Sequence, residues 1–137
     1  MKILVLCTGN SCRSQMAEAY LRFYANGRAE IFSAGIEAHG VNPKAIEILK
    51  EDEIDISRHS SNLIAEYEKI VFDYVLTVCD NAKEKCPYFP ATVKVIHRNF
   101  SDPSKTIGTP EDINNHFRIV RQQIKNYSKE LIENIFS

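Results

Sequence analysis

The sequence predicts an α/β fold built on a parallel sheet covered on both faces, and three observations support this prediction. Short apolar runs alternate along the chain with segments of helical periodicity, the order that right-handed strand–helix–strand units produce. The length of 137 residues suits one domain, spanning 1–137, with a single hydrophobic core. No internal repeat and no linker rich in Pro, Gly or Ser divides the chain.

Eight elements are expected along the chain. In order, they are strand Lys2–Leu6, helix Ser14–Tyr24, strand Glu30–Ser33, a helix that begins at Pro43, helix Ser61–Ile70, strand Tyr74–Val78, strand Thr92–Ile96 and helix Pro110–Phe136. The strands are short runs rich in apolar and β-favouring residues. The helices have apolar residues at roughly helical spacing, and Pro43 suits the first turn of its helix. Ser60 or Ser61 is available to cap the third helix.

Composition and charge exclude several classes of function. The chain is 44% hydrophobic and 26% charged, with a net charge of -1, so it lacks the basic excess of a nucleic-acid binder. No apolar run approaches the roughly 18–20 residues that span a bilayer, and Ile3–Leu6 is too short for a signal-peptide core. We expect a cytoplasmic monomer without nucleic-acid or membrane partners. Reducing conditions should keep its cysteines as thiols, with reactive or metal-binding roles.

The strongest motif directly follows the first strand. Residues Cys7–Ser14 form a C-x5-R-S pattern that leads into the first helix. In an open α/β sheet, ligands bind beyond the carboxyl ends of the strands, where N–H groups of the loop and helix N-terminus converge on an anion. The sequence therefore predicts an oxyanion site formed by Thr8, Gly9, Asn10, Ser11, Cys12, Arg13 and Ser14.

Individual residues of this loop suit anion binding and nucleophilic attack. Gly9 lets the loop curl, and Asn10 tolerates a left-handed conformation. Arg13 offers a planar fork to two oxyanion oxygens. The converging dipoles should stabilise Cys7 as a thiolate nucleophile, and Ser14 can donate to its sulfur or cap the helix. The G-K-S/T ending of a nucleotide P-loop is absent.

Asp102, just past the last predicted strand, is a candidate general acid. A carboxylic acid there can reach the oxyanion site and protonate a leaving oxygen. The alternative is an ordinary Asp-Pro turn.

Three segments resemble a known family. They are LCTGNSCRSQMAEA at Leu6–Ala19, SAGIEAHGVNPKAIE at Ser33–Glu47 and the Asp102-Pro103 segment. They resemble the low-molecular-weight tyrosine phosphatase superfamily, and within it most of all the thioredoxin-coupled arsenate reductases of arsenic detoxification. The likeness covers nearly the whole chain. It implies a flavodoxin-like three-layer fold with a four-stranded parallel sheet, arsenate as substrate with phosphate or sulfate as mimics, thioredoxin as electron donor, and no tightly bound cofactor.

The resemblance also implies a relay of three cysteines. Cys7 attacks arsenate, with Asp102 as proton donor, and Cys79 then attacks Cys7 and releases arsenite. Cys86 attacks Cys79, which leaves a Cys79–Cys86 disulfide for thioredoxin to reduce. The segment Asp80–Pro90 would have to move, and its low apolar periodicity fits a loop or marginal helix. From the residues alone, Cys79 is also open to a role as a packed core thiol, and Cys86 as an ordinary surface residue.

Some reductases of this family bind potassium near the catalytic loop, and the resemblance extends partly to that site. Asn10, Glu18 and Ser33 match the oxygen ligands, but Asn62 stands where an aspartate is expected, which removes one anionic ligand. The alternative is that these residues only cap and form hydrogen bonds.

Two other functions stay open at this point. A phosphatase acting on phosphotyrosine or small phosphoesters would need Cys7, Arg13 and Asp102 alone. Ser104 and Lys105 replace the aromatic residues typical of the phosphatases after Asp102-Pro103, which disfavours an aromatic substrate. An oxyanion-binding or thiol-sensing protein would use its cysteines as a switch. For the arsenate reductase, a glutaredoxin is an alternative to thioredoxin as the reductant. Solvated or structural roles are expected for His39, His59, His97 and His116.

Overall fold

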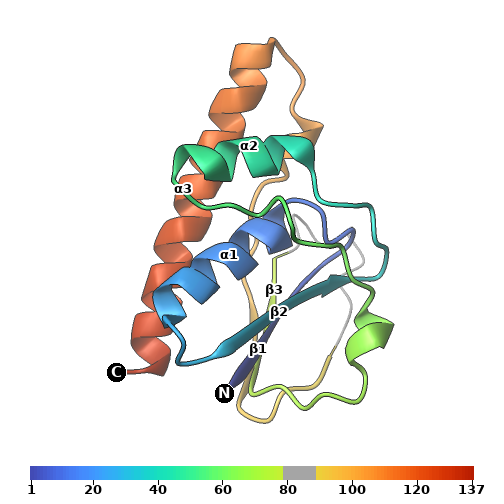
Figure 1. Ribbon diagram of the computed structural model, residues 1–137, viewed down its shortest axis with the longest axis vertical. Helices are drawn as coiled ribbons and strands as arrows, with labels where there is room; N and C mark the ends of the chain where they lie inside the picture. The colour runs from blue at the N-terminus through green and yellow to red at the C-terminus, as the bar shows by residue number, and fades with distance from the viewer. Residues whose placement is uncertain (79–88) are drawn as a thin grey trace.

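The computed structural model describes residues 1–78 and 89–137, and Figure 1 shows the arrangement of their helices and strands. In chain order these are β1 (Lys2–Cys7), α1 (Arg13–Ala25), β2 (Glu30–Gly35), α2 (Pro43–Glu51), η1 (Ile64–Tyr67), β3 (Tyr74–Thr77), β4 (Lys94–His97), η2 (Pro103–Lys105) and α3 (Pro110–Ile135). The elements η1 and η2 are short 3-10 helices. None of the helices in this part of the chain combines the length and apolar character needed to cross a membrane.

The four strands form one parallel sheet in the order β2-β1-β3-β4, which confirms the predicted α/β fold. β1 is central and pairs with β2 from Lys2 opposite Glu30 to Cys7 opposite Gly35. The chain passes from β1 to β2 on one side and returns to β3 on the other, so the strand order reverses beside β1. Because the connections diverge there, a crevice is expected at the carboxyl end of β1.

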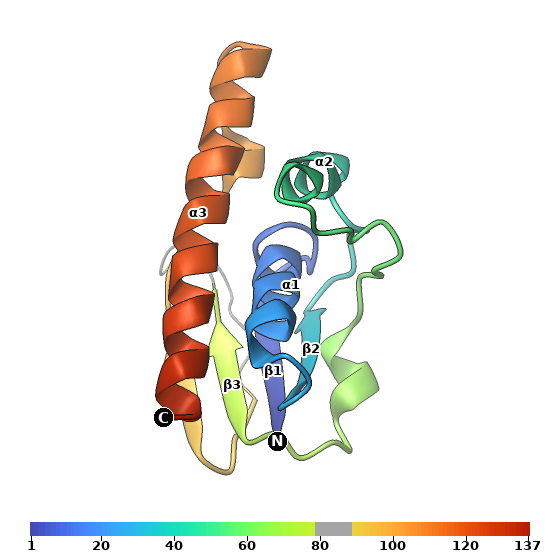
Figure 2. The ribbon, with the colours of Figure 1, turned by 60° about the vertical axis from the view of Figure 1, so that its left-hand side comes forward.

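The side chains of β1 alternate between two hydrophobic clusters on opposite faces of the sheet. Ile3 and Val5 belong to the larger cluster, which α1 and α3 complete. Leu4 and Leu6 belong to a smaller cluster, which includes the buried ring of Phe72. Figure 2 shows α1 and α3 together on one side of the sheet. The sheet therefore holds α1, and with it the loop that precedes α1, in a fixed position.

The prediction of a helix over Ser61–Ile70 is wrong, because only the short η1 forms within that segment. The backbone of this segment bonds to other parts of the protein: the Asn62 N–H donates to Asn10 Oδ1 at 2.7 Å, and the Asn62 carbonyl accepts from the Gly35 N–H at 2.9 Å. The Ser61 hydroxyl, expected to cap a helix, donates to the Asn10 carbonyl at 2.6 Å. These tertiary bonds replace the helical ones.

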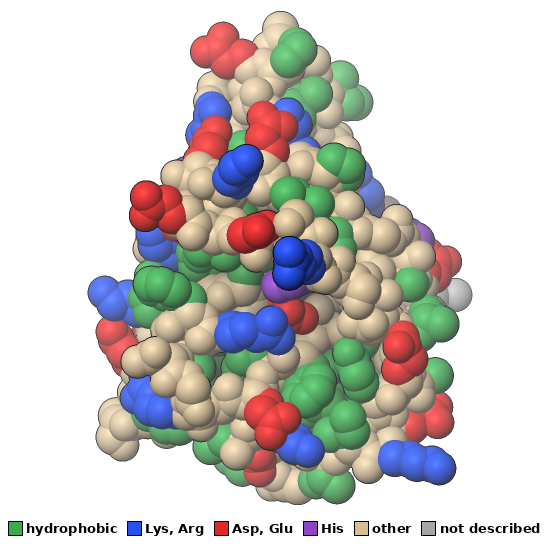
Figure 3. All heavy atoms as spheres, in the orientation of Figure 1, with side chains coloured by type: hydrophobic (Ala, Val, Ile, Leu, Met, Phe, Trp, Pro, Cys, Tyr) green, Lys and Arg blue, Asp and Glu red, His purple; other side chains and the backbone are tan. Residues whose placement is uncertain are grey.

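A cluster of ion pairs joins α2 to α3. The Glu51 carboxylate accepts from Arg118 at 2.8 and 3.0 Å and from Arg121 at 3.0 Å. The hydrogen bonds from Arg118, and then those from Arg121, lower the pKa of Glu51 from 4.5 to about 2. Side chains of both charges are mixed over the part of the surface where α2 crosses α3 (Figure 3).

Glu51→Gln should remove a stabilisation that depends on pH. Because the folded-state pKa of Glu51 is depressed, its contribution is fully present above pH 4.5 and is lost as the pH falls toward 2. Urea unfolding at pH 7 should show a small loss of stability, since the pair is exposed. The difference from wild type should shrink at acid pH. The control is Glu130→Gln on α3, and a difference that stays constant with pH would contradict the assignment.

Candidate active site

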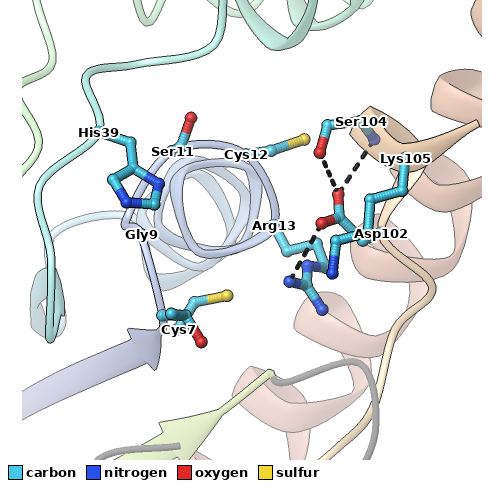
Figure 4. Close-up of a pocket in the computed structure, with 10 residues that line it drawn as sticks. Cys7, Gly9, Ser11, Cys12, Arg13, His39, Asp102, Ser104 and Lys105 are labelled. Atoms are coloured by element: carbon cyan, nitrogen blue, oxygen red, sulfur yellow. Dashed lines mark hydrogen bonds and ion pairs between the residues drawn. The ribbon is translucent and has the colours of Figure 1, made fainter. Parts of the chain in front are cut away.

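A cavity of about 240 Å³ opens at the carboxyl end of β1, where the strand order predicts a crevice (Figure 4). Its walls come from the loop after β1, the segment after β2, and η2; they are Cys7, Thr8, Gly9, Ser11, Cys12, Arg13, His39, Asp102, Ser104 and Lys105. The cavity therefore brings together Cys7, Arg13 and Asp102, which were proposed from the sequence to carry the chemistry. It is small, and most of the side chains that line it are polar or charged, as a site for a tetrahedral oxyanion requires.

Asn10 and Ser14 support the loop after β1 from behind the cavity. Asn10 is fully buried and has a φ of 46°, the left-handed conformation expected for it. Its Nδ2 donates to Ser14 Oγ at 2.9 Å, while its Oδ1 accepts from the Asn62 N–H. Gln15 Nε2 donates to the carbonyls of Asn10 and Ser60 at 3.1 and 3.0 Å. Side chains outside the cavity therefore set the shape of the loop.

Arg13 joins three parts of the site. Its side chain is 5% exposed, and its Nη1 donates to the carbonyl of Phe100 at 3.2 Å and to that of Val78 at 3.4 Å. Its Nη2 lies 3.6 Å from Asp102 Oδ2. Since Arg13 is the first residue of α1, these contacts align the start of that helix with the end of β3 and with the segment after β4.

Asp102 caps η2 and faces the guanidinium of Arg13 (Figure 4). Its Oδ1 accepts from the Ser104 N–H at 3.0 Å and from the Ser104 hydroxyl at 2.6 Å, so Oδ2 is the oxygen turned toward Arg13. From the sequence, Ser104 was noted only because it stands where the phosphatases typically have an aromatic residue. The Asp-Pro-Ser order, in which Asp caps a turn and bonds to the residue two positions later, was the available signal.

Cys12 lines the cavity but is unsuited to act as a nucleophile. Burial, with the negative charge of Asp102 as a smaller contribution, raises the pKa of the Cys12 thiol far above its ordinary value. The thiol therefore stays protonated at physiological pH, and the relay implied by the resemblance uses Cys7, Cys79 and Cys86 without it. Cys7, also buried, lies at the end of β1.

His39 lies over Gly9 at one end of the cavity, and sequence reasoning did not place it there (Figure 4). A Cβ added to Gly9 would lie 2.4 Å from His39 Nδ1, so the absence of a side chain at this position makes room for the imidazole. The other imidazole nitrogen of His39 contacts the Glu37 carboxylate at 2.5 Å. The relevant signal was the segment Ser33–Glu47, which covers the end of β2 and the chain after it. There the N–H groups of Glu37 and His39 donate to the carbonyls of Thr8 and Gly9 at 3.0 and 3.1 Å.

The four residues matched to a potassium site lie close together but bond to one another and to basic side chains. Glu18 Oε1 accepts from the Ser33 hydroxyl at 2.7 Å. Glu18 Oε2 lies 3.2 Å from Arg22 Nη2 and 3.3 Å from His59 Nδ1. The side-chain oxygen of Asn10 accepts from the Asn62 N–H. A guanidinium therefore pairs with the single carboxylate of this set, at the position that the resemblance gives to a potassium ion.

Cys79 and Cys86, the second and third thiols of the predicted relay, lie outside the described residues, as does the segment 80–88 of the predicted loop. Val78, the last described residue before them, follows β3 and supplies its carbonyl to Arg13. Their participation stays a prediction from the sequence.

Comparisons with known proteins assign the family. The model of the low molecular weight phosphotyrosine protein phosphatase family matches residues 2–136. The chain belongs to this family. An arsenate reductase of Bacillus subtilis is 46% identical over 131 residues, which cover 96% of this chain and 94% of that protein.

Two solved structures extend the comparison within the low molecular weight phosphotyrosine protein phosphatase fold. One, an arsenate reductase in the phosphate binding state, has a TM-score of 0.77 at 30% identity and covers 98% of both chains. The other, a thioredoxin-dependent arsenate reductase of Corynebacterium glutamicum, has a TM-score of 0.72 at 25% identity, over 98% of this chain and 60% of that one. The resemblance predicted from Leu6–Ala19, Ser33–Glu47 and Asp102-Pro103 is thereby confirmed.

Gly35→Ala should distort the loop after β1. A Cβ at Gly35 would lie 2.5 Å from the Thr8 carbonyl oxygen and 2.8 Å from those of Cys7 and Glu37, all of them backbone atoms. We expect a loss of stability of about 1–3 kcal/mol by urea unfolding. Phosphate affinity, measured by titration calorimetry, should fall by about tenfold or more, which corresponds to about 1.4 kcal/mol of binding energy.

Gly40→Ala is the matched control. Its φ of 82° disfavours alanine, but no atom lies within 4 Å of the added Cβ. It should lose stability while keeping the phosphate affinity of the wild type. Equal phosphate affinity for both variants would contradict the role given to Gly35.

Proposed function

We propose that this chain reduces arsenate to arsenite, with Cys7 as nucleophile and a thioredoxin-type protein as the reductant. The observation that carries the attack of Cys7 on an oxyanion is the small cavity lined by Cys7, Arg13 and Asp102 at the carboxyl end of β1. The identity of 46% to an arsenate reductase over nearly the full length supports the same reaction. A relay of free thiols requires reducing conditions, and we propose the cytoplasm as its compartment.

In the first step, the Cys7 thiolate attacks the arsenic of arsenate. A sulfur–arsenic bond forms and an arsenic–oxygen bond breaks, and the departing hydroxyl leaves as water with a proton from Asp102. Backbone N–H groups of the loop after β1 and the Arg13 guanidinium neutralise the oxyanion. The carbonyls of Phe100 and Val78 hold that guanidinium in place before the substrate arrives.

In the second step, the Cys79 thiolate attacks the Cys7 sulfur. The sulfur–arsenic bonding pair moves to arsenic, which is reduced from As(V) to As(III) and leaves as arsenite, and a Cys7–Cys79 disulfide forms. Cys86 then attacks Cys79 and releases the Cys7 thiolate, and a dithiol of the thioredoxin type reduces the Cys79–Cys86 disulfide. The parts given to Cys79 and Cys86 rest on the sequence.

A phosphatase activity at the same site is a second candidate, favoured by the family match over residues 2–136. Phosphate esters and arsenate present similar tetrahedral oxyanions, and hydrolysis needs Cys7, Arg13 and Asp102 without further thiols. The two candidates differ in their need for Cys79 and Cys86.

The deciding assay is arsenate-dependent NADPH consumption in the presence of thioredoxin and thioredoxin reductase. Cys7→Ser should abolish turnover, because no sulfur–arsenic bond forms. Cys79→Ser and Cys86→Ser should abolish multiple turnover, because no disulfide reaches thioredoxin. Glu130→Gln, exposed on α3 and outside the cavity, is the control and should retain turnover. Full turnover by Cys79→Ser would overturn the relay, and hydrolysis of p-nitrophenyl phosphate by the same variant would favour the phosphatase.

The contacts of Glu18 predict that potassium is not required. Arg22 and His59 already lie beside the carboxylate that would bind the ion. Arsenate turnover and the unfolding midpoint should therefore be the same in potassium chloride and in tetramethylammonium chloride of equal ionic strength. An increase of either quantity that saturates with potassium would contradict this expectation.

A further inference from the structure

We propose that His116 is a positioning residue that fixes the segment carrying the general acid, by binding a hydroxyl group on each side of Asp102. This inference rests on the proposed function, because it assigns to His116 a part in placing Asp102. From the sequence, only a solvated or structural role was expected for His116, which stands alone on the predicted C-terminal helix.

Both imidazole nitrogens of His116 contact hydroxyl groups of the segment 101–106. Nε2 lies 2.8 Å from Ser101 Oγ, and Nδ1 contacts Thr106 Oγ1. Ser101 immediately precedes Asp102, and Thr106 immediately follows η2. One side chain of α3 therefore holds the segment at both ends.

The hydrogen-bond partners assign the tautomer. Thr106 Oγ1 donates its proton to the Pro103 carbonyl at 2.7 Å, so it must accept from Nδ1–H of His116. A neutral imidazole carries one proton, so Nε2 accepts from the Ser101 hydroxyl. All three polar groups are then satisfied in one arrangement, which gives the contact a defined geometry.

Packing fixes part of the position of this segment, because Pro103, next to Asp102, is buried. The segment's remaining contacts set its shape. The Ser104 bonds to Asp102 and the Thr106 N–H bond to the Pro103 carbonyl are internal to it. Phe100 is buried and anchors the chain before Ser101. After Pro103 the chain is less well packed, since Ser104 and Lys105 are exposed and Ile107 is 98% exposed. His116 provides the link to α3 on that side.

The link matters because α3 and α1 pack against each other in the larger core cluster. Phe117, next to His116, is buried there together with Tyr20 and Leu21 of α1. Arg13 begins α1, and its Nη2 lies 3.6 Å from Asp102 Oδ2. Through these elements His116 maintains the spacing between the acid and the oxyanion loop. Loss of the link should affect proton donation more than anion binding.

The test is a double-mutant cycle between His116→Leu and Asp102→Asn, read as the single-turnover rate of arsenite release from the reduced protein. General acids contribute about 10²–10⁴-fold, so a displaced acid should lower the rate by about tenfold in His116→Leu. In the Asp102→Asn background the same substitution should have little further effect, because His116 acts through Asp102. Phosphate affinity should stay within about twofold of wild type, since the 7–14 loop is intact.

Three further variants test the geometry. His116→Gln keeps one donor and one acceptor and should recover part of the rate. Ser101→Ala and Thr106→Val remove the two hydroxyls separately, and each should lower the rate less than His116→Leu. Ile119→Ala, exposed on the same helix, is the control and should match wild type. Thermal unfolding of every variant reports on folding.

The outcomes separate the inference from the proposed function. The role of His116 would be overturned if His116→Leu lowered the rate equally in the wild-type and Asp102→Asn backgrounds. It would also be overturned if His116→Leu alone left the rate unchanged. An unchanged rate in Asp102→Asn, or no arsenite release by wild type, would instead contradict the proposed function. Nitrogen NMR of the imidazole gives a readout that needs no activity: the Nδ1–H tautomer is expected, and an Nε2–H tautomer would overturn the assignment.

Discussion

The contacts of the Arg13 guanidinium are the constraint on which the rest of the site depends. A buried cation must be paired and hydrogen-bonded, or its desolvation is costly. Here two carbonyl groups, from the end of β3 and from the segment after β4, share that task with Asp102. Three segments far apart in the sequence therefore meet around one side chain. Arg13 lines the cavity between them, and these contacts fix the orientation of its guanidinium before an anion binds.

The fold was predictable because its signals are local and repeated. Lys2–Cys7 and Tyr74–Thr77 are short apolar runs, and the amphipathic pattern of α3 extends over most of Pro110–Ile135. Ser61–Ile70 was mispredicted because the competing bonds come from residues distant in sequence. The Asn62 backbone bonds to Asn10 and to Gly35, and no propensity within the segment encodes those partners.

The part of the site formed by one contiguous motif was predictable from the sequence. The part formed by contacts between separate elements was not. Cys7–Ser14 is contiguous, so its chemistry could be inferred from residue types. The pairing of Glu18 with Arg22 and His59 involves a neighbour one helical turn away and a residue from a separate segment. Arg22 therefore neutralises the Glu18 carboxylate, which the sequence had suggested as a cation ligand. The position of His116 beside Ser101 and Thr106 likewise depends on the packing of α3, which sequence spacing does not encode.

A cavity of this kind does not by itself distinguish arsenate reduction from phosphate ester hydrolysis, because both begin with Cys7 attack on a tetrahedral anion. The reactions diverge at the covalent adduct. Water attacking phosphorus regenerates the thiolate and transfers no electrons, whereas a thiol attacking the Cys7 sulfur sends the bonding pair to arsenic. Sulfur attack needs a second thiolate near Cys7, while water attack needs a base on the far side of the phosphoryl group. The position of Arg13 and Asp102 serves the common first step, so specificity for reduction must come from the thiols that follow β3.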